Sequence, residues 1–365
     1  MDTNWDCMTI KKLWFLFLFL SLFFRGYSQD SLSTEKKEKG IIILPVIFFS
    51  PETSLGFGAA DIVYFRVGKN ALKKPSSIRN VFVYTLENQI LFKNPFNIFL
   101  NEDKNWIRGE LSYFNFPYEY YGIGSDISLD SAESYDAEYI RLEFTWLKKH
   151  KNLYIGPAVF FDSYLNLSTM ENGGLEQNKV KGIEGGNVFG YGLNMIWDRR
   201  NNLFCPKSGF YIEAQLSRFE DKLIGDYPFT NFIFDARKYV HAGSSWELGF
   251  QLYHQSVIGQ PPFYNLARLG GSKQMRGYFN GAYRDNHQTV LQTEVRRYLF
   301  KRIVGSVFGG VGAVSSDFGQ FNHLLPSYGL GLRYDIDPKE KIRIRLDYAW
   351  GKDTQGFYIN INEAF

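Results

Sequence analysis

Residues that could perform catalysis or bind a metal occur in this sequence, but their spacing does not form a site. The five histidines lie far apart and match none of the ligand spacings of zinc sites. No serine or cysteine lies in a recognisable nucleophile turn. Gly56-Phe-Gly58 and Gly329-Leu-Gly331 match only the first three residues of a dinucleotide-binding fingerprint, and both lie in segments that are expected to be strands. We therefore expect no enzymatic activity, no metal site and no cofactor.

Charged side chains instead recur at every second position of apolar segments. Segment 341–350 carries Arg343, Arg345 and Asp347 between apolar residues. The same alternation recurs in segments 139–146, 210–217 and 245–253. Because successive side chains of a strand point to opposite faces, each segment is expected to form a strand with one charged and one apolar face. We expect the charged faces to line a wet lumen, where the charges pair with one another.

The composition agrees with strands that face lipid on one side. The chain of 365 residues has 7 Trp, 24 Tyr and 34 Phe, which make up 18% of it, and it also has 34 Gly. Its mean hydropathy is −0.25, which argues against a bundle of membrane helices. The net charge of +3 gives no argument for a nucleic-acid partner, and 2 Cys cannot build a disulfide framework.

The N-terminus resembles a secretory signal peptide. Lys11 and Lys12 precede an apolar stretch at 13–24, which is shorter than the roughly 20 residues that a membrane anchor needs. We expect residues 1–28 to be the signal peptide and the polar residues 29–40 to be a short, disordered periplasmic leader. Residues 41–365 would then form a single domain.

The sequence predicts an all-β, transmembrane, antiparallel β-barrel of about 16 strands over residues 41–365. An even number of strands suits a bacterial single-chain barrel. With a periplasmic N-terminus, the periplasmic turns are short and the external loops are long. The long loops are 116–136, 165–186, 256–285 and 315–325. This asymmetry is typical of outer-membrane barrels, and we expect an integral protein of the outer membrane of a Gram-negative bacterium.

One long loop, between the predicted strands 11 and 12, carries a recognisable motif. Leu269-Gly-Gly271 precedes Gln274-Met-Arg-Gly-Tyr278, and the next strand carries Gln292, Glu294 and Arg296 at alternate positions. This order resembles the Omp85 superfamily, which includes surface antigen D15 and the BamA/TamA-like barrels. In that family an Arg-Gly-Phe/Tyr signature lies at the tip of the loop between strands 11 and 12. Here Arg276, Gly277 and Tyr278 match it, and the apolar content of the loop indicates that it folds into the lumen.

Two further segments agree with this resemblance. Asp198-Arg199, followed by Pro206-Lys-Ser-Gly209, is similar to the family's turn between strands 8 and 9. The last residue, Phe365, follows Phe357, Ile359 and Ile361 at alternate positions, which resembles the terminal signal that the barrel assembly machinery reads. The resemblance spans residues 41–365 and implies that this machinery inserts the chain into the membrane.

The chain departs from the family pattern in two places. Gly310 stands where the family has an aspartate that often holds the loop arginine, so we expect Arg276 to pair with Glu294 or with Asp347, beside Arg296. The family's periplasmic POTRA domains are too large for residues 29–40, which alone separate the predicted signal peptide from the barrel. We therefore expect a POTRA-less member.

The closing seam of the predicted barrel contains a proline. Closure requires the first strand, at 41–49, to pair with the last strand, at 356–365, but Pro45 cannot donate a hydrogen bond to the ladder. We therefore expect the seam to be the weakest pairing in the wall. The resemblance implies that a client strand or a lipid path opens there.

The resemblance implies a role in membrane biogenesis: assisting the insertion or translocation of proteins, or of lipids, at the outer membrane. The expected partners are outer-membrane lipids, client outer-membrane or secreted proteins, and the barrel assembly machinery. A passive pore or structural barrel whose long loop plugs the lumen is the alternative. A third hypothesis is a hydrolase with its site at the rim. It would be supported by an activity on lipid or peptide that a single loop mutation removes.

Overall fold

The computed structural model describes residues 39–50, 54–68, 74–243 and 245–365. The predicted signal peptide and residues 29–38 of the predicted leader lie outside this range. Residues 39 and 40 of that leader already belong to the first strand, β1 (Lys39–Ser50). Within the described part of the chain, no helix is long and apolar enough to span a membrane.

Sixteen strands form one antiparallel sheet in which each strand pairs with its neighbours in the chain, apart from a small insertion between β11 and β14. The strands after β1 are β2 (Ser54–Phe65), β3 (Ser76–Thr85), β4 (Ile90–Leu100), β5 (Asn105–Tyr120), β6 (Glu133–His150), β7 (Leu153–Ser168), β8 (Gly186–Asp198), β9 (Gly209–Glu220), β10 (Phe229–Ala242), β11 (Trp246–Gly259), β14 (His287–Tyr298), β15 (Ile303–Ser315), β16 (Leu325–Asp337), β17 (Ile342–Gly351) and β18 (Thr354–Ile361). The prediction of an all-β protein with about sixteen antiparallel strands is confirmed.

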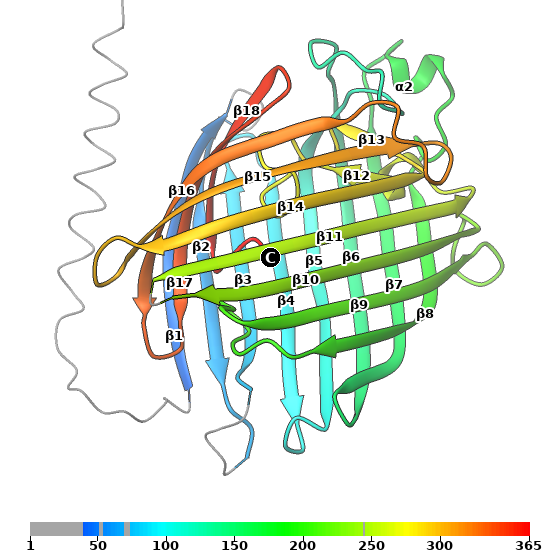
Figure 1. Ribbon diagram of the computed structural model, residues 1–365. Helices are drawn as coiled ribbons and strands as arrows, with labels where there is room; N and C mark the ends of the chain where they lie inside the picture. Colours follow the sequence, from blue (N-terminus) through cyan, green and yellow to red (C-terminus); the bar gives the residue numbers. More distant parts are fainter. Residues whose placement is uncertain (1–38, 51–53, 69–73, 244) are drawn as a thin grey trace, which may run out of the picture. The chain divides into compact units, whose positions relative to one another are not determined.

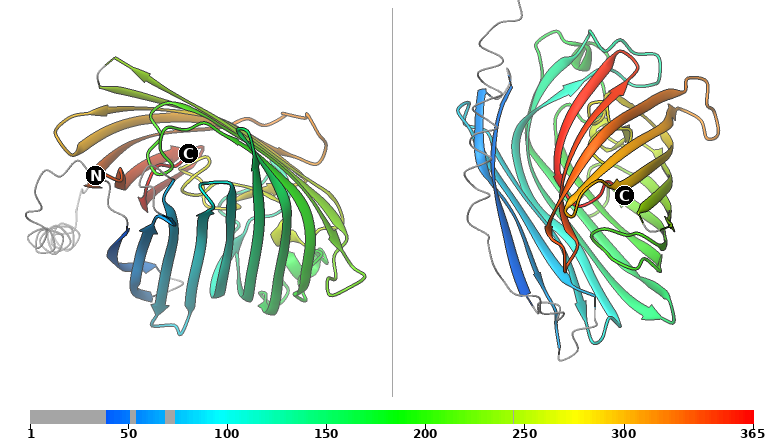
Figure 2. Two further views of the ribbon diagram at one scale, coloured as in Figure 1. Left: turned by 90° about the horizontal axis from the view of Figure 1, so that it is seen from below. Right: turned by 60° about the vertical axis from the view of Figure 1, so that its left-hand side comes forward.

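The sheet curves around the segment that connects β11 to β14. Figure 1 shows the strands side by side in chain order, and Figure 2 shows this yellow segment and the C-terminus on the concave side of the sheet. The segment contains a 3-10 turn, η2 (Phe263–Asn265), and a two-stranded ribbon of β12 (Ala267–Leu269) and β13 (Tyr283–Asp285). A four-residue helix, α2 (Gly174–Gln177), lies in the β7–β8 loop.

Polar and apolar side chains separate onto the two faces of the sheet. Along β8, Leu193, Met195 and Trp197 are exposed on the convex face, whereas the side chain of Asn194 between them is buried. Along β17, Arg343, Arg345 and Asp347 are buried on the concave face. This separation suits a wall with lipid outside and a polar lumen inside.

The two ends of the sheet differ from the predicted seam. β1 and β18 each pair with one strand only, so the described sheet has two edges and no β1–β18 ladder. In β1, Pro45 lies opposite Ala59 of β2. A proline cannot supply a donor to a second ladder, which agrees with its position on an edge strand.

Side chains nevertheless bring the two edges together at the rim that carries the short turns. Ile42 of β1 and Ile361 of β18 pack against one apolar cluster around Tyr64 and Ile342. The Tyr64 hydroxyl donates to Asp337 at 2.8 Å. Arg66, just after β2, forms an ion pair of 2.6 Å with Glu340 in the β16–β17 turn. These contacts connect the edges without backbone hydrogen bonds.

The C-terminal end of the chain also departs from the sequence expectation. The last strand was expected to reach Phe365, but β18 ends at Ile361 and Asn362 adopts a left-handed conformation, with φ of 70°. The Asn362 backbone N–H donates to the carbonyl of Arg343 at 2.7 Å, which turns the chain into the lumen. Phe365 is therefore buried against Tyr239 rather than exposed at the end of a strand.

Candidate functional site

The loop with the Arg-Gly-Tyr motif, residues 260–286, folds inward as the sequence predicted. Leu269, Met275 and Tyr278 form an apolar cluster with residues of β14 to β16, including Val290 and Leu325. This packing explains why the loop carries so many apolar side chains. The loop thus presents its tip, and with it Arg276, to the inner wall.

Arg276 is held by two carboxylates. Its guanidinium donates to Glu294 of β14 at 2.6 Å and to Asp347 of β17 at 2.7 Å. The Arg276 side chain is 1% exposed, and both carboxylates are fully buried. The guanidinium carbon lies 3.4 Å from the ring centroid of Phe308, in cation–π geometry. The structure thus brings Arg276 together with both acids that the sequence analysis proposed.

Arg333 of β16 bridges the same two acids from the other side. Its Nη2 lies 2.6 Å from Glu294 and its Nη1 lies 2.7 Å from Asp347. Arg296, the third predicted partner, contacts Glu294 at 2.8 Å and not Arg276. Sequence reasoning did not select Arg333, although its place between Leu332 and Tyr334 follows the usual alternation.

Glu363 from the inward-turned C-terminus adds a third buried acid to this network. Its carboxylate lies 3.3 Å from Arg296, 3.2 Å from Arg333 and 2.9 Å from Arg343. Burial raises the pKa of Glu363, but the arginines outweigh burial and hold its pKa at about 2. Glu363 therefore serves as a counterion to the lumen arginines, a role that the sequence analysis did not assign to it.

Gly277 and Tyr278 fix the loop tip against β16 to β18. Gly277 has φ of +105°, and a Cβ atom there would lie 2.6 Å from the carbonyl carbon of Trp350, so no larger residue fits. Its N–H donates to the Tyr358 hydroxyl at 2.9 Å. The Tyr278 hydroxyl donates to the carbonyl of Pro326 at 2.7 Å.

The glycine at position 310 is explained by the close approach of β14. A Cβ atom on Gly310 would lie 2.7 Å from Cβ of Gln292 and 2.8 Å from the carbonyl oxygen of Leu291, so an aspartate does not fit there. Gln292 in turn accepts from the N–H of Met275 at 3.3 Å and donates to the carbonyl of Lys273 at 2.9 Å. A neutral side chain thus holds the loop backbone here, and the acids Glu294 and Asp347 hold Arg276.

The residues proposed for the seam and the terminal signal lie apart from Arg276. Phe357 and Ile359 are exposed on the convex face of β18, Ile361 is partly buried near the rim, and Pro45 lies on the opposite edge strand. Tyr358, between the two exposed residues, contacts the motif: its hydroxyl accepts from the Gly277 N–H and donates to the carbonyl of Tyr278. No cluster of His, Cys, Asp and Glu in the described ranges could hold a metal ion.

The arrangement of motif, strands and loop agrees with a family comparison. The model of the Omp85 superfamily domain matches residues 91–365, which is most of the chain. The chain belongs to the Omp85 superfamily. No curated protein matches this Omp85 chain in sequence.

Solved structures share the fold of this Omp85 barrel. BamA from Haemophilus ducreyi lacking POTRA domains 1–3 matches with a TM-score of 0.56 and 14% identity, over 90% of this chain and 70% of that chain. CdiB from Acinetobacter baumannii matches with a TM-score of 0.56 and 10% identity, over 90% of this chain and 60% of that chain. The protein is an integral outer-membrane β-barrel of the Gram-negative type.

Proposed function

We propose that this barrel assists the insertion or translocation of proteins at the outer membrane, without covalent chemistry. The observation that carries the proposal is the free edge of β18, which pairs with β17 alone and lies next to the anchored Arg-Gly-Tyr motif. The structural neighbours BamA and CdiB support the fold on which this proposal rests.

An edge strand presents unpaired backbone N–H and C=O groups, which another chain can use to form a ladder. β18 pairs with β17 from Ile344↔Ile361 to Gly351↔Thr354, so its other side is available along its length. The motif stabilises this strand from inside through the bond between Gly277 and Tyr358. We infer that the buried ion pairs of Arg276 keep β18 in place while a client strand is added to it.

Disulfide locking tests this role. A variant with Ile42→Cys and Ile361→Cys joins the two edges where their side chains share a cluster. The matched control, Ile344→Cys with Ile361→Cys, joins β17 to β18, which are already paired. Ile43→Cys with Ile359→Cys supplies a second register for the edge lock.

Each variant replaces the native chain in cells depleted of it, and outer-membrane proteins and lipids are quantified under oxidising and reducing conditions. We expect oxidation of an edge lock to reproduce the depletion phenotype and reduction to relieve it, while the control behaves as wild type. If an edge lock that forms fully leaves protein and lipid levels unchanged, the proposed use of the edge is wrong. A change in lipids alone would assign lipids as the cargo.

A plugged pore is the second candidate function. It is supported by the segments that fill the lumen. Loop 260–286 occupies the long-loop side, while Phe204 and Cys205 of the β8–β9 turn are buried near the C-terminal tail at the other rim. Deleting residues 260–283 and measuring bilayer conductance separates the two functions. A plug predicts a large, stable conductance after the deletion, whereas an insertion barrel predicts a loss of client proteins.

A further inference from the structure

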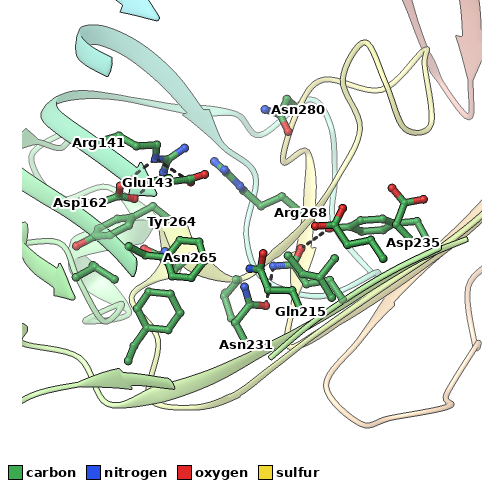
Figure 3. Close-up of a pocket in the computed structure, with 18 of the residues that line it drawn as sticks. Arg141, Glu143, Asp162, Gln215, Asn231, Asp235, Tyr264, Asn265, Arg268 and Asn280 are labelled. Atoms are coloured by element: carbon green, nitrogen blue, oxygen red, sulfur yellow. Dashed lines mark hydrogen bonds and ion pairs between the residues drawn. The ribbon is translucent and has the colours of Figure 1, made fainter. Parts of the chain in front are cut away.

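A polar cavity of about 420 Å³ lies between the inward loop and the wall formed by β5 to β11 (Figure 3). Arg276 is held by β14 and β17, outside this part of the wall. The loop contributes Tyr264, Asn265, Arg268 and Asn280 to the lining. The volume falls in the range of about 300–1,000 Å³ that is typical of small-molecule sites.

The charges on the wall side of the cavity are already paired. Arg141 donates to Asp162 through two bonds of 2.9 and 2.6 Å. Arg108 pairs with Glu213, which also accepts from Asn194 at 2.8 Å. Glu143, 3.8 Å from Arg141, and Asp235, which pairs with Arg237, also line the wall. The wall thus offers a fixed, hydrogen-bonding surface with more acidic than basic groups, and the cation available to a ligand lies on the loop side.

The loop side, in contrast, has polar groups without partners. Arg268 forms no ion pair or hydrogen bond with the residues that the structure describes, and Figure 3 shows its side chain extending into the cavity. The Oδ1 atom of Asn265 is buried and also has no hydrogen-bond partner within the described part of the chain. A buried polar atom without a partner is costly, so the Asn265 oxygen requires an explanation. Arg268, which is partly exposed, places a cationic donor in the same cavity.

A second arginine increases the positive charge next to this site. Arg284 of β13 lies directly opposite Arg268 of β12 in the ribbon. Both side chains lie against Gly281, where a Cβ atom would be 3.2 Å from Arg268 Cδ and 3.2 Å from Arg284 Nη2. Arg284 donates to the carbonyls of Gly281 and Glu119, and neither arginine has a carboxylate partner among the described residues. Like charges opposite each other in a ribbon are destabilising unless an anion offsets them.

We propose that this cavity binds an anionic, hydroxyl-rich molecule, namely a phosphorylated or carboxylated saccharide. Arg268 binds the anionic group, and Asn265 Oδ1 accepts from a hydroxyl. The aromatic rings of Phe160, Phe219 and Tyr264 in the lining supply apolar surface for the C–H faces of a sugar ring. Because the loop is anchored to β14 and β17 through Arg276, the ligand connects the loop to the β5–β11 wall as well.

Calorimetric titration of the full-length protein, folded in neutral detergent micelles, tests the site. The probes are glucose 6-phosphate and glucuronate, with glucose and inorganic phosphate as specificity controls. The variants are Arg268→Gln and Asn265→Ala, and Lys222→Gln, in the exposed β9–β10 loop, is the matched control. Heat-modifiable migration confirms that each variant is folded.

We expect the charged sugars to bind at least about tenfold more tightly than glucose or phosphate, and Arg268→Gln to remove about tenfold of this affinity. Asn265→Ala should weaken the charged sugars and leave phosphate unchanged, while Lys222→Gln behaves as wild type. Equal binding of all four probes, or unchanged affinity in both lumen variants, would overturn the proposal.

A parallel titration with lipopolysaccharide in the same detergent identifies the source of the ligand. Tighter binding of lipopolysaccharide than of the free sugars, abolished by Arg268→Gln, assigns a lipid-linked saccharide. Binding of the free sugars alone assigns a soluble one. Binding of phosphate alone would show an anion site and refute the saccharide.

Discussion

Replacing Arg276 by alanine removes the central contact between the inward loop and the wall. The substitution breaks two buried ion pairs, with Glu294 and Asp347, and the stacking on Phe308. Breaking a buried pair on one side costs about 3–5 kcal/mol. Arg333 still contacts both acids, so neither is left alone, and the lower end of this range applies. Loss of the cation–π contact adds about 1–2 kcal/mol. We therefore expect a loss of about 4 kcal/mol in the free energy of unfolding.

Urea unfolding in detergent micelles, followed by tryptophan fluorescence and by heat-modifiable migration, measures this loss. Limited proteolysis reports the release of loop 260–286 independently. Arg302→Ala, in the exposed β14–β15 turn, is the matched control and should change little. Arg276→Lys should recover only part of the loss, because one ammonium cannot reproduce the two-sided arginine contact. A change below about 1 kcal/mol together with an unchanged protease pattern would refute the anchor.

Three other substitutions test neighbouring parts of the account. Gly277→Ala should release the loop tip to proteases, because φ of +105° and the approach to Trp350 exclude a Cβ atom; a native protease pattern would contradict this. Gly310→Asp should destabilise the barrel in urea by about 1–3 kcal/mol, because its Cβ would meet Cβ of Gln292 and the carbonyl oxygen of Leu291; unchanged stability would contradict the steric explanation. Glu363→Gln should expose the C-terminus to carboxypeptidase at neutral pH. The folded pKa of Glu363 is depressed to about 2, so the stabilisation that it provides is present above its ordinary pKa and is lost as the pH falls towards 2. If the C-terminus of the Glu363→Gln variant resists carboxypeptidase at pH 7, this role is contradicted.

Local alternation was sufficient to predict the strands. Charged and apolar side chains alternate within each strand, and this is the property that burial on the lumen face and exposure on the lipid face require. The pairing of Arg276 with Glu294 and Asp347 followed from the motif and from the missing acid at Gly310. Because Gly310 supplies no carboxylate, acids on neighbouring lumen-facing positions were the predicted partners.

Long-range features were not accessible in the same way. The alternation holds through Phe357, Ile359 and Ile361, and Glu363 breaks it at the next apolar position. This local signal marks the end of the strand. It does not reveal that Asn362 turns the chain inward or that Glu363 pairs with arginines of three other strands. Pairing across the predicted seam also depends on residues that are distant in the sequence. Whether β1 reaches β18 is decided by the curvature of the whole sheet, whereas Pro45 reveals only that β1 suits an edge.

Photo-crosslinking from the edge strand in living cells tests the central proposal most directly. A photoreactive amino acid replaces Ile359 of β18, and Leu330 of β16, which is equally exposed but lies between two paired strands, provides the control. The account predicts that the Ile359 position captures other outer-membrane proteins during their synthesis and that the Leu330 position does not. Capture of lipid alone at both positions, with no client at Ile359, would contradict it.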